Sequence, residues 1–276
     1  HIWHVRDWFQ EFRVAWKPYS FYMRTCSDRI VTVSEAMARQ FDDRRNVEVI
    51  HDGFSMAEFD VRKQELGEAF RKEYGLAGRF VVGCVGRIKL VRKGQEFLIQ
   101  AASILKQRNR KITCLIVGAP FPGNEGHLTE LKRLAGELGV AEQVIFTGEI
   151  PDARPAYAAM DVVALPSAQP EPFGGVVIEG MAMGLPIVAT NIGGSVEQVV
   201  EGKTGFLIPP ADPEALAEKI ELLMSDDALR ARLGSAGPGR VSRDLTLSSM
   251  VRKIERLYSQ VLDDRGWPSS HPLDDR

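Results

Sequence analysis

The hydrophobic residues of this chain are concentrated in short runs that alternate with amphipathic stretches. The apolar runs predict buried strands at 80–88, 112–118, 144–148, 161–166, 186–190 and 205–208. The stretches at 94–107, 128–138, 153–160 and 213–224 have the apolar periodicity of helices. Strands and helices in alternation indicate an α/β fold with a doubly wound parallel sheet, in which ligands bind beyond the carboxyl ends of the strands.

The residues before 61 predict a second, incomplete α/β unit. Its strands, 30–33 and 47–50, flank a helix at 35–41 for which Ser34 is a good N-cap. The chain begins at His1 in mid-domain, without a methionine or a signal peptide, so we expect a fragment whose upstream part is missing. We divide it into a partial N-terminal domain (1–60), a connector with one helix (61–79), a C-terminal domain (80–245), an amphipathic helix (246–264) and a disordered tail (265–276).

The composition and the absence of certain motifs argue against several classes of protein. The chain has 276 residues and a net charge of −2, without the basic excess of a nucleic-acid-binding protein. It lacks an apolar run long enough to cross a membrane. Its three cysteines are far apart, and Cys84 and Cys114 lie in predicted strands, which favours buried free thiols in a reducing compartment such as the cytoplasm. The absence of G-x-G-x-x-G argues against an NAD or FAD enzyme.

The segment from Glu171 to Glu179 is the strongest candidate for chemistry. Pro172 restricts Glu171 to extended geometry, and Gly174 and Gly175 let the backbone approach a ligand closely. We expect a helix to begin at these glycines, and its free amides suit phosphate or sugar oxygens. Glu179 falls in the second turn, roughly 8 Å along the helix axis, so the two acids can contact different parts of one ligand.

The motifs resemble a known family. E-P-F-G-x-x-x-x-E followed by G-M-A-x-G-x-P-I-V-A-T-x-x-G-G-x-x-E is similar to family 4 of the retaining glycosyltransferases, which have the GT-B fold. The similarity also includes Val85-Gly86-Arg87 and Lys93-Gly94, and it extends over residues 80–262. It implies one complete C-terminal Rossmann-like domain and the last part of an N-terminal Rossmann-like domain. In GT-B enzymes the final helix crosses back toward the N-terminal domain.

The resemblance also implies an activity. A sugar would pass from a UDP-, GDP- or ADP-sugar to a hydroxyl of a glycan, a lipid or a small molecule, with retention of configuration and without a cofactor. The sequence has no D-x-D pair of the kind that holds a divalent ion in the other major transferase fold. We therefore expect no metal, and expect cationic side chains to stabilise the departing diphosphate.

The resemblance assigns roles to individual residues. Arg87 and Lys93 would hold the diphosphate, Glu171 would face the hydroxyls of the donor sugar, and Glu179 the ribose hydroxyls. Further donor contacts would come from the backbone of Phe173, Gly174 and Gly175 and from the turns at Gly86 and Gly194. His4 resembles a histidine that lies near the donor sugar, although a structural histidine at a strand end fits equally well.

Several alternatives stay open. Aromatic and basic residues are interleaved between Trp3 and Arg24, which fits a lipid surface or an acceptor, as at the inner face of a membrane, but also a domain core. The family's usual Asn-Gly is replaced by Asp52-Gly53, and the first glycine-rich loop of the N-terminal domain is absent. A non-catalytic nucleotide-sugar-binding fragment or pseudoenzyme is therefore the second hypothesis. The third is a hydrolase that uses Glu171 and Glu179 as an acid/base pair.

Overall fold

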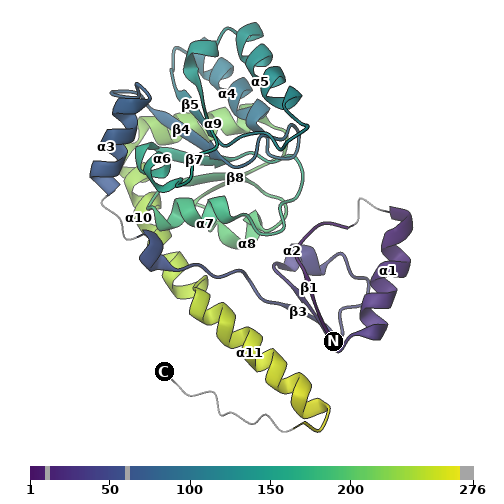
Figure 1. Cartoon of the computed structure of the whole chain (residues 1–276). Helices are drawn as coiled ribbons and strands as arrows, with labels where there is room; N and C mark the ends of the chain where they lie inside the picture. Colours follow the sequence, from purple (N-terminus) through teal and green to yellow (C-terminus); the bar gives the residue numbers. More distant parts are fainter. Residues whose placement is uncertain (10–12, 60–62, 268–276) are drawn as a thin grey trace. The chain divides into compact units, whose positions relative to one another are not determined.

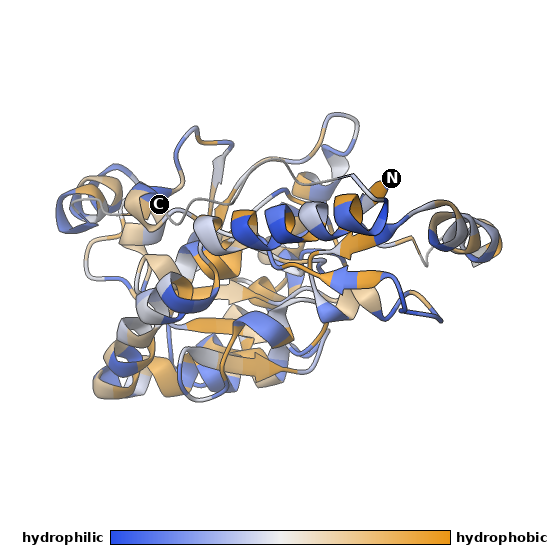
Figure 2. Ribbon diagram, turned by 90° about the horizontal axis from the view of Figure 1, so that it is seen from below, coloured by the Kyte–Doolittle hydropathy of each residue, from blue (hydrophilic) through white to orange (hydrophobic). Residues whose placement is uncertain are grey.

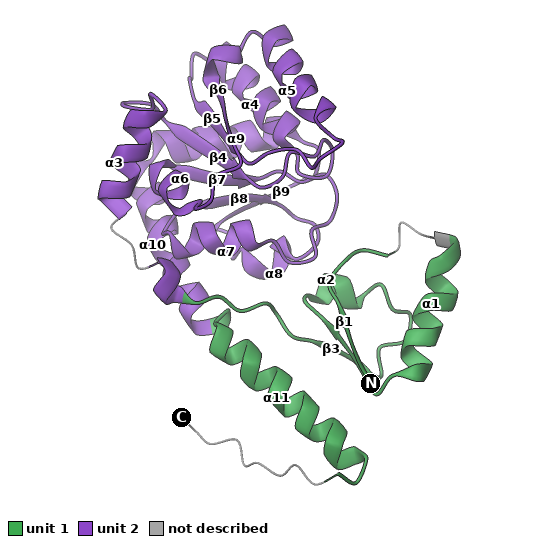
Figure 3. Cartoon of the chain, viewed as in Figure 1, with its two compact units in different colours: residues 1–55, 244–276 green, residues 56–243 purple. Residues whose placement is uncertain are grey.

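The computed structural model describes residues 1–9, 13–59 and 63–267 (Figure 1). The chain forms two compact units (Figure 3). The smaller unit combines His1–Ser55 with the C-terminal segment from Asp244, and the larger unit is Met56–Arg243. The tail that the sequence predicts for 265–276 falls mostly outside the described residues.

The larger unit is built on a parallel sheet of six strands. They lie in the order β6-β5-β4-β7-β8-β9. Their bounds are β4 (Val81–Val85), β5 (Thr113–Val117), β6 (Val144–Gly148), β7 (Val162–Leu165), β8 (Ile187–Thr190) and β9 (Gly205–Ile208). The strand order reverses between β4 and β7, where doubly wound sheets bind their ligands. The predicted α/β fold is therefore confirmed, with every predicted strand of this unit present.

Helices cover both faces of this sheet. They are α3 (Lys63–Glu73), α4 (Gln95–Gln107), α5 (Gly126–Glu137), α6 (Arg154–Ala159), α7 (Gly175–Ala182), α8 (Ser195–Gln198), α9 (Pro213–Ser225) and α10 (Asp227–Asp244), with short 3-10 turns η1 (Met56–Phe59) and η2 (Ala141–Gln143). Helix α4 packs against α9 and α5. Helix α3, from the predicted connector, packs against α6 and so belongs to this unit.

The core of the larger unit is apolar and closed. Residues from strands and helices, among them Val82, Leu98, Ile116, Val188 and Ile220, form one buried cluster. In Figure 2 the strands are largely hydrophobic in colour, whereas the helices alternate hydrophilic and hydrophobic residues. The thiols of Cys84 and Cys114 are buried and unpaired, as predicted, and burial raises the pKa of Cys84 to about 12. These cysteines are therefore packing residues rather than nucleophiles.

Helix α10 has no counterpart in the sequence prediction. Its sequence contains Pro238 and three glycines, a composition that argues against a helix. Tertiary packing explains two of these glycines. A Cβ added to Gly237 would lie 2.5 Å from the backbone oxygen of Met181, and one added to Gly234 would lie 2.3 Å from that of Gly184. The helix thus uses glycine to pack closely against the end of α7.

The smaller unit has a parallel sheet of three strands in the order β1-β2-β3. Its elements are β1 (Ile2–Val5), α1 (Arg13–Cys26), β2 (Arg29–Thr32), α2 (Glu35–Ala38), β3 (Val47–Val49) and α11 (Leu247–Asp264). The Ser34 side chain accepts a hydrogen bond from the backbone N–H of Met37, which confirms the predicted N-cap. Leu257 of α11 packs against Val31 and Ile50, so the last helix and the first strands share one core.

Helix α1 was also not predicted. It places some of the aromatic residues between Trp3 and Arg24 in the core and others on the surface. Trp16 and Met23 are buried, and the Trp16 ring stacks on Phe9. Phe21 and Tyr22 are exposed by 60% and 52%. The cluster is therefore partly domain core and partly surface. Among the described residues, no helix is both long enough and apolar enough to cross a membrane.

The close packing of α10 leads to a stability prediction. Gly237→Ala should destabilise the protein by about 1–3 kcal/mol, because the added methyl group would overlap with the Met181 backbone. The matched control is Gly239→Ala in the same helix. A Cβ there meets nothing within 4 Å, so the control should be neutral or stabilising by up to about 1 kcal/mol. Urea unfolding measures both values, and equal effects would contradict this account of α10.

Candidate active site

The loops that follow β4 and β7 are packed together at the point where the strand order reverses. The backbone N–H of Ala168 donates to the Val91 oxygen at 3.1 Å. Gly94 adopts a positive φ of 72°, and a Cβ there would lie 2.0 Å from the Pro166 oxygen. Only glycine permits this approach at unchanged backbone positions. The loop that carries the predicted cations is thereby held against the loop that carries Glu171.

Lys93 and Glu171 form an ion pair at this junction. The Nζ of Lys93 lies 2.9 Å from Oε2 of Glu171, and their side chains are exposed by only 21% and 8%. The Ser167 hydroxyl lies 3.5 Å from the other carboxylate oxygen. The structure thus brings together two side chains 78 positions apart in sequence, one from each predicted motif. An ammonium and a carboxylate with little solvent around them can both contact a polar ligand that enters here.

The glycine pair of the following loop holds the Glu171 backbone. Gly194 donates its N–H to the Glu171 oxygen at 2.8 Å. Gly193 has a positive φ of 62°, and a Cβ on it would lie 2.4 Å from the same oxygen. The Gln198 amide also donates to the oxygen of Gly174 at 3.1 Å. Gly193 and Gly194 of the G-G-x-x-E motif, together with Gln198, therefore hold the Glu171 loop in position.

Helix α7 begins at Gly175, as predicted, and presents its first amides next to the Glu171 loop. Gly174 precedes the helix in an extended conformation, and Phe173 is buried. Glu179 lies in the second turn and accepts a hydrogen bond of 2.7 Å from the hydroxyl of Tyr157. Tyr157 is fully buried, and burial together with Glu179 raises its pKa well above the usual value. The tyrosine therefore stays protonated and acts as a donor that orients Glu179.

Arg87 lies apart from the Lys93–Glu171 pair. Its guanidinium stands 5.5 Å from the centre of the Phe121 ring, and the side chain is exposed. With Gly86, it lines a cavity of about 410 Å³. Among the described residues no carboxylate lies within ion-pair distance of Arg87. Glu179 and Tyr157 line a neighbouring cavity of about 400 Å³, and Ala153 contributes to both.

His4 belongs to the smaller unit. It lies on β1, and its Nε2 is 3.3 Å from the hydroxyl of Tyr258 on α11. Partial burial and the nearby charge of Arg6 lower the pKa of His4. These contacts account for a structural histidine that joins the sheet to the last helix. The proximity of His4 to a donor sugar stays a prediction.

Sequence reasoning missed the contacts made by Tyr157, Ser167 and Gln198. Ser167 directly follows a predicted strand, so its position at the carboxyl edge was a usable signal. Tyr157 had no such signal. It lies in a short helix, and its hydrogen bond to Glu179 connects residues 22 positions apart. Gln198 likewise contacts Gly174 across 24 positions.

Comparison with known proteins identifies the family of this chain. The sequence profile of the family described as Glycosyl transferases group 1 matches residues 67–240. The chain belongs to this family. The matched residues include Lys93, Glu171, Glu179 and Tyr157, and the whole match lies within the larger unit.

Two curated relatives are similar over part of their length. The chain is 33% identical over 236 residues to the D-inositol 3-phosphate glycosyltransferase of Corynebacterium urealyticum, an alignment that covers 83% of this chain and 55% of the relative. It is 39% identical over 176 residues to the GDP-mannose-dependent alpha-(1-6)-phosphatidylinositol monomannoside mannosyltransferase of Mycolicibacterium smegmatis, which covers 60% of this chain and 44% of that protein. The chain thus spans about half the length of these relatives.

Solved structures show the same fold. The crystal structure of Anabaena HepE in complex with UDP and glucose matches with a TM-score of 0.85 at 27% identity, over 94% of this chain and 71% of that protein. A glycosyltransferase from Rickettsia africae matches with a TM-score of 0.82 at 26% identity, over 95% of this chain and 71% of that chain. These matches confirm the predicted α/β architecture of GT-B type.

The Tyr157–Glu179 hydrogen bond leads to a second prediction. Tyr157→Phe should lower the free energy of unfolding by about 1–2 kcal/mol, because the Glu179 carboxylate loses its buried donor. Tyr74→Phe is the control, since the Tyr74 ring stacks on Phe70 and should tolerate loss of the hydroxyl within about 0.5 kcal/mol. Urea unfolding of Tyr157→Phe, Glu179→Ala and the double variant gives the coupling energy. A coupling near zero would show that the bond contributes nothing.

Proposed function

We propose that this chain is the donor-binding part of a retaining, metal-independent glycosyltransferase of family 4. The donor would be a UDP-, GDP- or ADP-sugar, and the acceptor a hydroxyl of a glycan, a lipid or a small molecule. The observation that carries the proposal is the Lys93–Glu171 ion pair, which lies at the sheet edge where such folds bind ligands. Support also comes from HepE, which is similar over 94% of this chain and was crystallised with UDP and glucose.

The chemistry follows from the charges at this edge. In sugar transfer the bond between the anomeric carbon and the diphosphate oxygen breaks, and the acceptor oxygen forms a bond to that carbon on the same face. The acceptor proton passes to an oxygen of the departing phosphate. Negative charge grows on the diphosphate, where Lys93, Arg87 and the first amides of α7 would stabilise it. No protein nucleophile is needed.

The two acids would hold the ends of the donor. Glu171, already in contact with Lys93, would accept hydroxyl hydrogen bonds from the sugar while the ammonium turns to the phosphate. Glu179, oriented by Tyr157, would accept both ribose hydroxyls. The arrangement is less suited to hydrolysis by an acid/base pair, since an ammonium and a phenol already donate to these carboxylates.

A second candidate is donor binding without turnover. The chain spans only 55% and 44% of the length of two curated relatives. Binding and transfer therefore need separate measurements. The acceptor, contact with a membrane surface and a cytoplasmic location stay predictions of the sequence.

Donor binding tests the site itself. Calorimetry with UDP and GDP should show binding by the native chain, and Lys93→Met should weaken it by about tenfold or more, because a charge-assisted hydrogen bond to phosphate is lost. The control is Lys72→Met, which removes an exposed lysine from α3 and should leave the affinity unchanged. If a folded native chain binds no nucleotide, or if the two variants behave alike, the proposal is wrong.

A measurement of sugar transfer distinguishes a catalytically active enzyme from a fragment that only binds the donor. With the chain joined to the expected upstream residues, Glu171→Gln should reduce sugar transfer by about a hundredfold while UDP affinity changes little, because Glu171 would contact the sugar rather than the nucleotide. Transfer should also persist in EDTA. Activity abolished by EDTA and restored by a divalent ion would refute metal independence, and binding without any transfer would favour the second candidate.

A further inference from the structure

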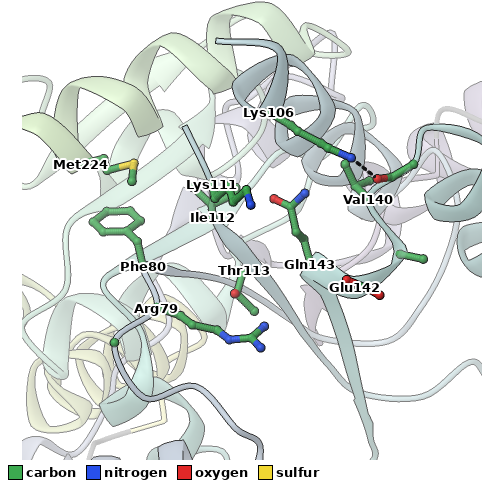
Figure 4. Close-up of a pocket in the computed structure, with 13 residues that line it drawn as sticks. Arg79, Phe80, Lys106, Lys111, Ile112, Thr113, Val140, Glu142, Gln143 and Met224 are labelled. Atoms are coloured by element: carbon green, nitrogen blue, oxygen red, sulfur yellow. Dashed lines mark hydrogen bonds between the residues drawn. The ribbon is translucent and has the colours of Figure 1, made fainter. Parts of the chain in front are cut away.

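A second concave site lies at the opposite end of the larger unit's sheet. A cavity of about 710 Å³ is formed where β4, β5 and β6 begin, between residues that precede these strands and the ends of α4 and α9 (Figure 4). Lys93 and Glu171 follow the carboxyl ends of strands, so this site is separate from the candidate active site. Its volume is in the range of small-molecule sites.

The basic side chains around this cavity differ in whether they are already paired. Arg108 and Arg110, which lie nearby in sequence, form ion pairs with Glu221. Among the cavity residues, Lys106 donates to the backbone oxygen of Gly139 and thereby offsets the partial negative charge where α5 ends. Arg79 and Lys111 have no carboxylate within ion-pair distance among the described residues. The cavity therefore keeps two uncompensated cations.

One acid reduces this charge without removing it. Glu142 also lines the cavity, so its lining carries three basic side chains and one acidic side chain. Glu142 forms no ion pair with any of those three in the described part of the chain. The cavity thus remains net positive, which favours a ligand with at least one negative charge.

Two further features define the rest of the ligand. Phe80 and Met224 are only partly buried and form an apolar side of the cavity, opposite Gln143 and Lys106 in Figure 4. Arg230 covers the Phe80 ring at 5.2 Å from its centre. The side-chain oxygen of Gln143 is buried and has no hydrogen-bond partner among the described residues. That oxygen has almost no accessible surface, so the cavity offers a ligand an apolar contact at Phe80 and Met224 and no acceptor at Gln143.

We infer that this cavity binds a small aromatic carboxylic acid. The carboxylate contacts Arg79 and Lys111, and the ring packs against Phe80 and Met224. The inference does not depend on the proposed sugar transfer, because none of these residues belongs to the candidate active site. It adds a second ligand site at the amino ends of the strands.

Ligand-observed NMR titration with mandelate tests the inference. The native chain should bind mandelate, and Arg79→Met/Lys111→Met should bind it about tenfold more weakly or worse, because two charged contacts are lost. The matched control is Lys72→Met/Lys203→Met, which removes the same charge from two exposed positions and should bind like the native chain. Circular dichroism confirms that each variant is folded.

Three comparison ligands and one more variant make the test decisive. Benzyl alcohol lacks the charge and acetate lacks the ring, so both should bind at least about tenfold more weakly than mandelate, whereas phenylacetate, which keeps both, should bind about as tightly. Lys93→Met should leave mandelate binding unchanged. The inference is overturned if mandelate shows no binding up to about 10 mM, if benzyl alcohol or acetate binds as well, or if Lys93→Met weakens binding and the double variant does not.

Discussion

The arrangement of the larger unit depends on keeping Glu171 next to Lys93. Glu171 is 6% exposed, and a carboxylate with so little water requires a charged or hydrogen-bonding partner to avoid a penalty of several kcal/mol. That partner comes from a loop 78 positions earlier. The two loops can meet only because Gly94 lies against Pro166 and Gly193 lies against the Glu171 backbone. These glycines therefore allow the ammonium of Lys93 to lie 2.9 Å from the carboxylate of Glu171.

This constraint bears on the proposed chemistry. An ion pair that already exists in the free protein places an ammonium and a carboxylate close to where a phosphate and a sugar would bind. Both groups are already largely removed from water before a ligand arrives, which lowers part of the cost of binding. The side chain of Tyr157 is fully buried, and its hydroxyl orients the Glu179 carboxylate by donating a hydrogen bond to it. Both acids are thus held by neighbours, while Arg87 and the first amides of α7 are left for a ligand.

The two ends of the sheet carry different charge patterns. At the carboxyl ends, Lys93 is paired with Glu171 next to glycine-rich turns, and Glu179 accepts a hydrogen bond from Tyr157. At the amino ends, Arg79 and Lys111 have no carboxylate partner among the described residues and lie beside a partly apolar wall, while Arg108 and Arg110, close to Lys111 along the chain, are paired. Chain connectivity explains how the ends can differ, because each loop joins the sheet at only one of them.

The sequence by itself determined the parallel sheet, the start of α7 at Gly175 and the residue types at the candidate site. Apolar runs, glycine pairs and Pro172 act over a few neighbouring residues, and such local signals can be read from the chain directly. Tertiary structure alone decided that α1 and α10 are helices, that Tyr157 bonds Glu179, and that Lys93 pairs with Glu171 while Arg87 faces Phe121. Each of these depends on contacts between distant segments. The glycines of α10 show the reason, since a residue that weakens an isolated helix permits the close backbone contact that stabilises this one.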